Sequence, residues 1–108
     1  MASSRRDKVE ALLAEEPGDQ FLRYSLAMEL EKEADHEASL SHFASLQRDA
    51  KPYVPSFFMA AQQLARLGRL EDARSALRAG IDEARRQGDA HAAAEMSEFL
   101  VGLGGQGA

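Results

Sequence analysis

Residue types that bind metals gather between Glu33 and His42, a stretch with acidic side chains and two histidines. Two histidines on one helix face share a metal when they lie four residues apart. His36 and His42 are six residues apart, and His91 has no cysteine or carboxylate–histidine pattern beside it. We therefore expect no metal site, and we interpret residues 33–42 as a solvated charged corner.

The stretch from Gly102 to Gly107 reads GLGGQG and matches the pattern of a dinucleotide-binding loop. In dinucleotide folds that loop follows a strand and opens a helix, whose N-terminus binds the pyrophosphate. Here the glycines follow a predicted helix, so we expect them to end it without binding phosphate. Cysteine is absent, and no serine lies in a strand-to-helix elbow or near an implied histidine–aspartate pair. We expect no enzyme activity and no cofactor.

The net charge of −5 is unevenly spread, because residues 1–50 carry −5, residues 51–88 carry +3 and residues 89–108 carry −3. An acidic chain lacks the basic footprint that a phosphate backbone requires, so we expect no nucleic-acid partner. The basic segment contains these arginines: Arg66, Arg69, Arg74, Arg78, Arg85 and Arg86. Acidic residues interleave with them and can pair along a helix. We interpret the segment as a solvated ion-pair face, with an acidic protein partner as the alternative.

Nothing in the sequence indicates membrane insertion or secretion. The longest uncharged run is much shorter than a membrane span, and no apolar signal core follows Arg5 and Arg6. The absence of asparagine excludes N-linked glycosylation, and the absence of cysteine excludes disulfides. We expect a cytoplasmic protein with no membrane partner.

Composition and periodicity favour an all-α fold. Alanine, leucine, glutamate and arginine dominate, while β-branched residues are few, and a length of 108 residues suggests one domain. Residues 27–43 align with residues 61–77 at an offset of 34, small residues with small and large apolar residues with large. A fixed period of this size is typical of repeat proteins.

Each repeat divides into two helices with separate apolar faces, joined at a corner. Gly68 lies between the two faces of the second repeat, and glycine is almost without cost just past a helix end, where the backbone turns left-handed. In the first repeat the corner falls at Ala34 and Asp35, and Asp35 can cap the following helix. Pro17 and Gly18 interrupt the chain before another possible cap, Asp19.

We predict helices over about residues 5–16, 19–33, 36–50, 54–67, 70–87 and 89–101. The first of these matches the second helix of a repeat. The last has Ala92, Met96, Phe99 and Leu103 on one face, and we expect it to cover the end of the stack. We expect residues 1–4 and the glycine-rich residues 102–108 to be disordered.

This pattern resembles the tetratricopeptide repeat (TPR) family. The resemblance rests on the period, on Leu26-Ala27-Leu30 and Ala60-Ala61-Leu64, and on Gly68 followed by Ala73 and Leu77. It covers about residues 5–101 and implies a single all-α domain, a right-handed superhelix of antiparallel helix pairs with about six helices. The repeats would span about 20–53 and 54–87, and helices 5–16 and 89–101 would flank them.

Two residues of the first repeat depart from the family pattern. Arg23 occupies the place of an aromatic residue, which Phe57 fills in the second repeat. Leu46 occupies the place of a small residue, which Gly80 fills in the second repeat.

The resemblance also implies a concave face, lined by the first helix of each repeat, that binds an extended peptide or a helix. The residues carried over to that face are Phe21, Tyr24, Met28, Phe58, Gln62 and Arg66. The first three lie at i, i+3 and i+7, on a different face from the apolar pair Leu26 and Leu30, so their helix needs two surfaces to pack against. A groove ligand, the last helix or a second protomer are the three alternatives for covering the extra face.

We therefore expect a non-catalytic scaffold that binds an unidentified protein or peptide in a short apolar groove. Gln62, Arg66 and Glu31 would supply specificity. A structural homodimer that buries the same apolar stripe is the alternative. The resemblance does not extend to the clamp that grips chaperone C-termini, because that clamp uses asparagines and this chain has none.

Overall fold

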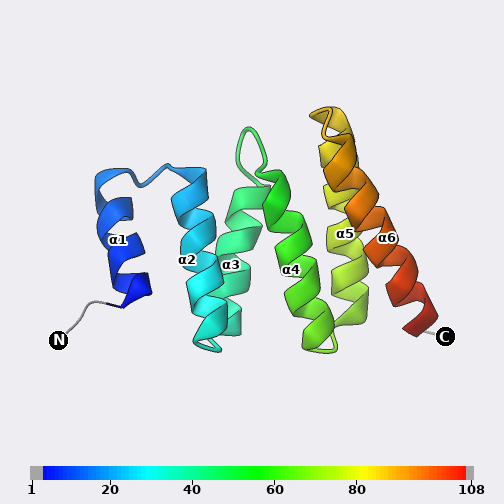
Figure 1. The fold of residues 1–108 in the computed structure, drawn as a ribbon, viewed down its shortest axis with the longest axis horizontal. Helices are drawn as coiled ribbons and strands as arrows, with labels where there is room; N and C mark the ends of the chain where they lie inside the picture. Colours follow the sequence, from blue (N-terminus) through cyan, green and yellow to red (C-terminus); the bar gives the residue numbers. More distant parts are fainter. Residues whose placement is uncertain (1–3, 107–108) are drawn as a thin grey trace. The chain divides into compact units, whose positions relative to one another are not determined.

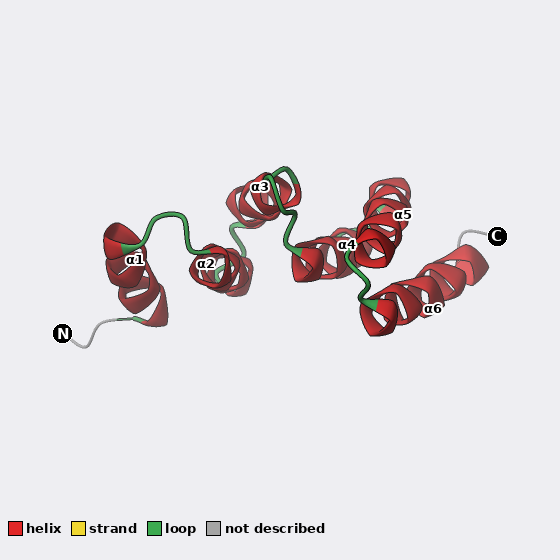
Figure 2. Ribbon diagram, turned by 90° about the horizontal axis from the view of Figure 1, so that it is seen from above, coloured by secondary structure: helices red, strands yellow, loops and turns green. Residues whose placement is uncertain are grey.

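The computed structural model describes residues 4–106 and confirms the predicted all-α fold (Figure 1). The helices are α1 (Arg5–Glu15), α2 (Gln20–Lys32), α3 (His36–Gln47), α4 (Val54–Arg66), α5 (Leu70–Arg86) and α6 (Ala90–Gln106). The described residues contain no strand, and short loops join the helices (Figure 2). Successive helices pack as antiparallel pairs, as the repeat pattern predicts.

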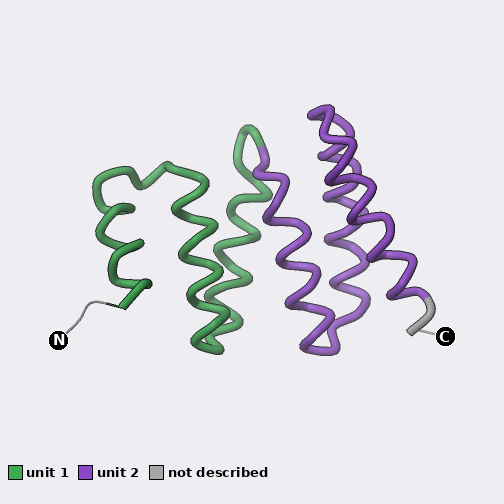
Figure 3. The backbone as a smooth tube through the Cα atoms, in the orientation of Figure 1, with its two compact units in different colours: residues 1–51 green, residues 52–108 purple. Residues whose placement is uncertain are grey.

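The chain divides into two compact units, residues 1–51 and residues 52–108 (Figure 3). In unit 1, α2 packs on both α1 and α3; in unit 2, α4, α5 and α6 pack on one another. The sequence predicts one domain over residues 5–101, with a repeat boundary between residues 53 and 54. The division between the units falls near that repeat boundary, and the single domain and the bounds of the repeats stay a prediction.

Gly68 forms the corner between α4 and α5, as its place between two apolar faces predicts. Its φ is +79°, in the left-handed region. The backbone N–H of Arg69 donates to the Leu64 carbonyl at 2.9 Å, and that of Gly68 donates to the Ala65 carbonyl at 3.0 Å. This pair of bonds satisfies carbonyls that the end of a helix otherwise leaves without partners.

Ala34 makes the same corner in unit 1, with a φ of +63°. The N–H of Asp35 donates to the Leu30 carbonyl at 2.9 Å, and that of Ala34 to the Glu31 carbonyl at 2.9 Å. The bonding pattern therefore repeats after 34 residues, although the corner residue is no longer a glycine. An L-residue in this conformation costs about 1–2 kcal/mol because its Cβ crowds the following carbonyl.

Side-chain caps begin most of the helices. Asp19 accepts a hydrogen bond from the N–H of Leu22 at 2.9 Å, and Asp35 caps α3 by accepting from Ala38. Ser4 and Asp7 form a reciprocal capping box at the start of α1. The predicted disorder of residues 1–4 thus does not extend to Ser4, and residues 1–3 lie outside the described residues.

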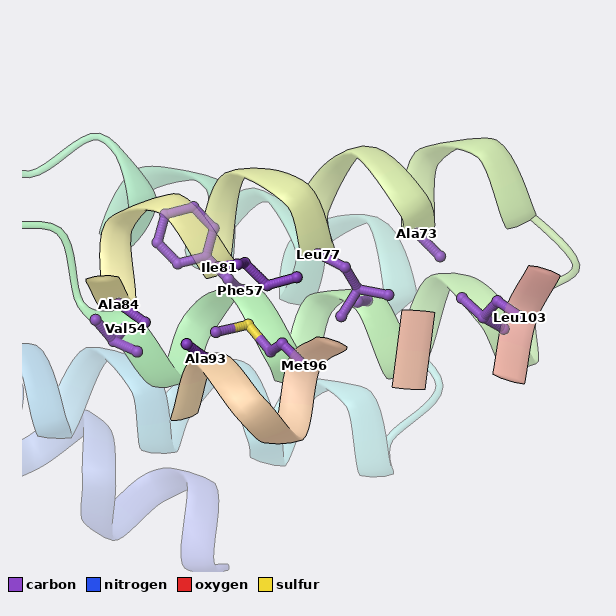
Figure 4. Close-up of a cluster of buried hydrophobic side chains, with 10 residues drawn as sticks. Val54, Phe57, Ala73, Leu77, Ile81, Ala84, Ala93, Met96 and Leu103 are labelled. Atoms are coloured by element: carbon purple, nitrogen blue, oxygen red, sulfur yellow. The ribbon is translucent and has the colours of Figure 1, made fainter. Parts of the chain in front are cut away.

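The core of unit 2 draws apolar side chains from all three of its helices (Figure 4). Its members are Val54, Phe57, Ala61, Ala73, Leu77, Ile81, Ala84, Ala93, Met96 and Leu103. Met96 and Leu103 are buried, as expected for the predicted apolar face of the last helix.

Gly80 allows the three helices of unit 2 to approach one another. A Cβ built on it would lie 2.5 Å from Phe57 Cβ and 2.6 Å from Met96 Sδ, far inside van der Waals contact. Because Phe57 Cβ is attached directly to the α4 backbone, it cannot move without the helix. The small residue that the pattern requires here is therefore a steric necessity.

One apolar cluster of unit 1 contains Val9, Leu26 and Leu30, with Leu13 packed against them, and Phe43 and Leu46 of α3 are fully buried as well. Val9 is the buried residue that α1 contributes, and it aligns with Phe43 and Leu77 at the repeat offset. Leu12, one turn further along α1, is 52% exposed. Helix α1 thus packs through a single narrow stripe, in the position of the second helix of a repeat.

Helix α6 continues to Gln106, beyond its predicted end at residue 101. The disordered tail predicted for residues 102–108 is therefore helical as far as residue 106, and residues 107–108 lie outside the described residues. Each helical glycine costs about 1 kcal/mol relative to alanine. Burial of Leu103 and a hydrogen bond of 3.0 Å from Arg74 Nη2 to the Leu103 carbonyl help to offset that cost.

The two corners predict opposite effects of matched substitutions. We expect Ala34→Gly to raise the free energy of unfolding, and Gly68→Ala to lower it, each by about 0.5–1 kcal/mol. No atom lies within 4 Å of a Cβ added to Gly68, so backbone conformation alone sets the cost there. Urea denaturation of the three chains measures both changes, and shifts of the same sign in both variants would contradict this account.

Gly80 and Gly102 provide a second matched pair, because both are helical but only Gly80 is packed closely. We expect Gly80→Ala to lower the free energy of unfolding by about 1–3 kcal/mol through overpacking. We expect Gly102→Ala to raise it by up to about 1 kcal/mol, since no atom lies within 4 Å of the added Cβ. Thermal denaturation tests both. A stabilised Gly80→Ala variant would show that the close packing around Gly80 leaves room for a larger side chain.

Candidate partner-binding surfaces

The residues predicted to face a partner lie on one helix of each unit. Phe21, Tyr24 and Met28 are on α2, and Phe58, Gln62 and Arg66 are on α4. The structure describes the two sets separately, and the groove that would join them remains a prediction.

We define the α2 surface as Phe21, Tyr24 and Met28. Its residues differ in solvent exposure. Phe21 is 63% exposed, while Tyr24 and Met28 are half-buried. The Tyr24 ring packs against the ring of buried Phe43 on α3, with centroids 5.8 Å apart and an interplanar angle of 59°. Phe21 is thus the residue most open to a partner, and Tyr24 is anchored from below by the core.

Arg23 fixes α2 to the end of α3. Its guanidinium donates to Asp49 Oδ2 at 2.6 Å and to Asp49 Oδ1 at 3.2 Å, and also to Ser45 Oγ at 2.9 Å. Gln20 Nε2 adds bonds to Asp49 Oδ2 at 2.9 Å and to the Lys51 carbonyl at 2.8 Å. Arg23 therefore replaces the aromatic packing of the second repeat with a charged hydrogen-bond network, which explains its departure from the family pattern.

This network holds the pKa of the Asp49 carboxyl below its ordinary value. The hydrogen bond from Arg23 is the main cause, followed by the hydrogen bond from Gln20. Both donors stabilise the ionised carboxylate, and they outweigh the desolvation that favours the neutral acid.

The α4 surface, defined as Phe58, Gln62 and Arg66, borders a hollow whose other wall is α6. Phe58 meets Phe99 edge to face, with ring centroids 5.5 Å apart and an interplanar angle of 70°. The hollow has a volume of about 430 Å³ and is lined by Phe58, Glu95, Glu98, Phe99, Gly102 and Leu103. Phe99 thus covers part of Phe58.

A second hollow of about 270 Å³ adjoins the first, because Phe99 and Leu103 line both. Its remaining lining comes from Gln62, Ala65 and Arg66 of α4. The α4 surface therefore borders a concave strip between α4 and α6, with carboxylates along the first hollow and a guanidinium at the second. Sequence reasoning named the last helix as one alternative for covering the apolar stripe, but it did not predict that Glu95 and Glu98 would line this strip.

The basic segment forms ion pairs along α5, as its interleaved charges predict. Arg74 pairs with Glu71, and Arg86 pairs with Glu83 at 3.1 Å. The pKa of Glu83 is lowered, first by a hydrogen bond from Gln87 and then by Arg86. Glu71 and Arg86 are exposed, whereas their partners Arg74 and Glu83 are largely buried, so only one member of each pair faces solvent.

Neither a metal site nor a membrane-spanning helix is found in the part of the chain that the structure describes. Within residues 4–106, no group of three or more histidine, aspartate or glutamate side chains is arranged to hold an ion. Among the same residues, no helix combines the length and the apolar character needed to cross a bilayer.

Comparisons with solved structures support the family resemblance. A TPR domain protein of Salinibacter ruber is 29% identical, and its solution structure superposes with a TM-score of 0.77, covering 82% of this chain and 90% of its own. A crystal structure of a TPR domain protein from the same organism gives 0.71 at 29% identity, covering 81% and 97%. A protein of Bordetella parapertussis is 25% identical with a TM-score of 0.79, covering 97% and 91%.

No protein-family model and no curated protein matches the sequence. The structural match to TPR domain proteins over most of the chain nevertheless confirms the resemblance. The number of repeats stays a prediction.

The Arg23 network predicts an acid-sensitive contribution to stability. Because the pKa of Asp49 is lower in the folded than in the unfolded chain, the contribution is present above the ordinary aspartate pKa of about 4 and is lost as pH falls below it. In Arg23→Met we expect the pKa of Asp49 to rise toward its ordinary value, as measured by NMR titration of the carboxyl carbon.

Arg48→Met is the matched control, since Arg48 is an exposed neighbour of Asp49 in sequence and carries the same charge. We expect this variant to leave the Asp49 titration nearly unchanged. Equal shifts in both variants would show that net charge, and not the Arg23 hydrogen bonds, sets the pKa.

Proposed function

We propose that this chain, which has the fold of TPR domain proteins, is a non-catalytic module that binds a protein segment, with the α2 surface of unit 1 and the α4 surface of unit 2 as separate candidate contacts. The observation that carries the proposal is the exposure of Phe21, 63%, on a helix whose opposite apolar face is already buried. Tyr24 and Met28 lie on the same face as Phe21, and the three residues form a stripe along α2. Contiguous apolar surface, and not a single exposed residue, is what marks a contact site, so the stripe as a whole supports the proposal.

The energetics fit a peptide or helix that docks by burying apolar side chains. Burying a phenylalanine side chain contributes about 1.5–3 kcal/mol, and aromatic residues are frequent anchors of protein interfaces. Tyr24 is held against Phe43, so it loses little side-chain freedom on binding. Gln62, Arg66 and Glu31 would add polar contacts that select among partners, as in helix-in-groove recognition.

The alternative is a homodimer in which the same stripe packs on its copy. A second protomer would bury Phe21 as effectively as a partner would, and a two-fold axis makes such an interface self-complementary. Sedimentation velocity at dilute concentration separates the two, because a monomer excludes the dimer. If the wild-type chain is a dimer and Phe21→Glu makes it a monomer, then a second copy covers the α2 surface, which is not open to another protein.

Affinity capture from a lysate of the source organism tests the proposal directly. We expect the wild-type chain to retain a protein that is lost with Phe21→Glu, because a charge at the anchor cannot be buried in an apolar contact. Phe21 is a better probe than Tyr24 or Phe58, whose rings pack against Phe43 and Phe99 and so affect folding.

Val101→Glu is the matched control for this experiment, because Val101 is 77% exposed and lies outside both surfaces. We expect the captured protein to be retained by this variant. Retention by both variants, or loss from both, would show that the α2 surface does not carry the binding.

A further inference from the structure

The first hollow of unit 2 combines an apolar floor with an acidic rim. Phe58, Phe99 and Leu103 form the floor, and Glu95 and Glu98 are the charged residues that line it. Both carboxylates come from α6, which contains no lysine or arginine. The charged residues that line this hollow are therefore both acidic.

The positions of these carboxylates along α6 do not favour the helix dipole. Acidic residues stabilise the first turn of a helix, but Glu95 and Glu98 lie beyond the first turn of α6. They are three residues apart, so they are neighbours on the helix surface and repel each other. A cation placed between them would relieve this repulsion.

The described residues do not supply such a cation. Glu98 has neither an ion-pair nor a hydrogen-bond partner among residues 4–106. Glu95 lies 3.2 Å from His91 Nε2, a contact that is an ion pair only when His91 is protonated. The acidic rim is thus open to a charge from outside the chain.

We infer that this hollow receives a lysine or arginine side chain of the partner segment, next to an apolar residue of the same segment. The methylene stem would pack on Phe58 and Phe99, whose ring faces also attract a cation, and the charged head would reach Glu95 and Glu98. This inference rests on the proposed function, because it specifies the chemistry of the segment that unit 2 binds.

The adjoining hollow differs from the first in the residues that line it. Gln62 and Arg66 contribute its polar side chains, and neither Glu95 nor Glu98 lines it. We therefore place the basic residue of the bound segment in the first hollow, over α6.

Selection from a library of random twelve-residue peptides displayed on phage tests the inference with the full chain. We expect the wild-type protein to enrich peptides that carry lysine or arginine beside an aromatic or aliphatic residue. In the double variant Glu95→Gln/Glu98→Gln, we expect the enriched peptides to bind about threefold to tenfold more weakly. Raising the salt concentration should weaken wild-type binding and affect the double variant less.

Glu15→Gln/Glu16→Gln is the matched control. These residues are exposed at the end of α1, and their substitution changes the net charge by the same amount. We expect the control to bind the enriched peptides as tightly as the wild type. Equal losses in both double variants would overturn the inference, because net charge alone would then explain the binding.

Two further outcomes separate this inference from the proposed function. Enriched peptides without a basic preference, bound equally by wild type and the Glu95→Gln/Glu98→Gln variant, would overturn the inference and leave the proposed function intact. No enrichment at all, together with self-association seen by sedimentation, would overturn both, because a second copy would then occupy the surface.

Discussion

The left-handed corner at the end of the first helix in each pair is the constraint on which the rest of the structure depends. It reverses the chain within three residues, so that each first helix lies antiparallel to its second helix. The corner also fixes which side chains of the two helices meet. Leu77 and Phe57 share a core in unit 2 because Gly68 sets their helices in register. Phe21 is the residue of the α2 surface that this pairing leaves exposed.

Sequence periodicity predicts this arrangement well, because each corner and cap is a local event. The bonds at Gly68, the cap at Asp19 and the burial of Leu103 depend on residues within a few positions or on a helical face. Other features depend on contacts between distant residues. The Arg23–Asp49 network joins positions that are 26 apart, and nothing in the local pattern links them. The extension of α6 likewise follows from a contact with Arg74, against the local cost of its glycines.

The candidate site also combines features that the local sequence predicts with features that depend on contacts between distant residues. Helical spacing predicts that Phe21, Tyr24 and Met28 share a face, but it does not rank their exposure, which depends on Phe43 across the pair. It likewise predicts an apolar face on the last helix, but not that Phe99 forms a hollow with Phe58 or that Glu95 and Glu98 rim it. The fold is shared with TPR domain proteins, whereas the charge around this hollow belongs to the sequence of this chain.

The central claim is that the surfaces of α2, α4 and α6 bind a protein segment, while the arginine-rich face of α5 stays in solvent. Amide chemical shifts of the chain, recorded while an enriched peptide is added, test it most directly. The account predicts shifts around Phe21, Phe58 or Phe99, and little change at Arg78 and Arg85. Shifts confined to Arg78 and Arg85 would contradict it, because binding would then use the charged face of α5 and leave the apolar surfaces without a role.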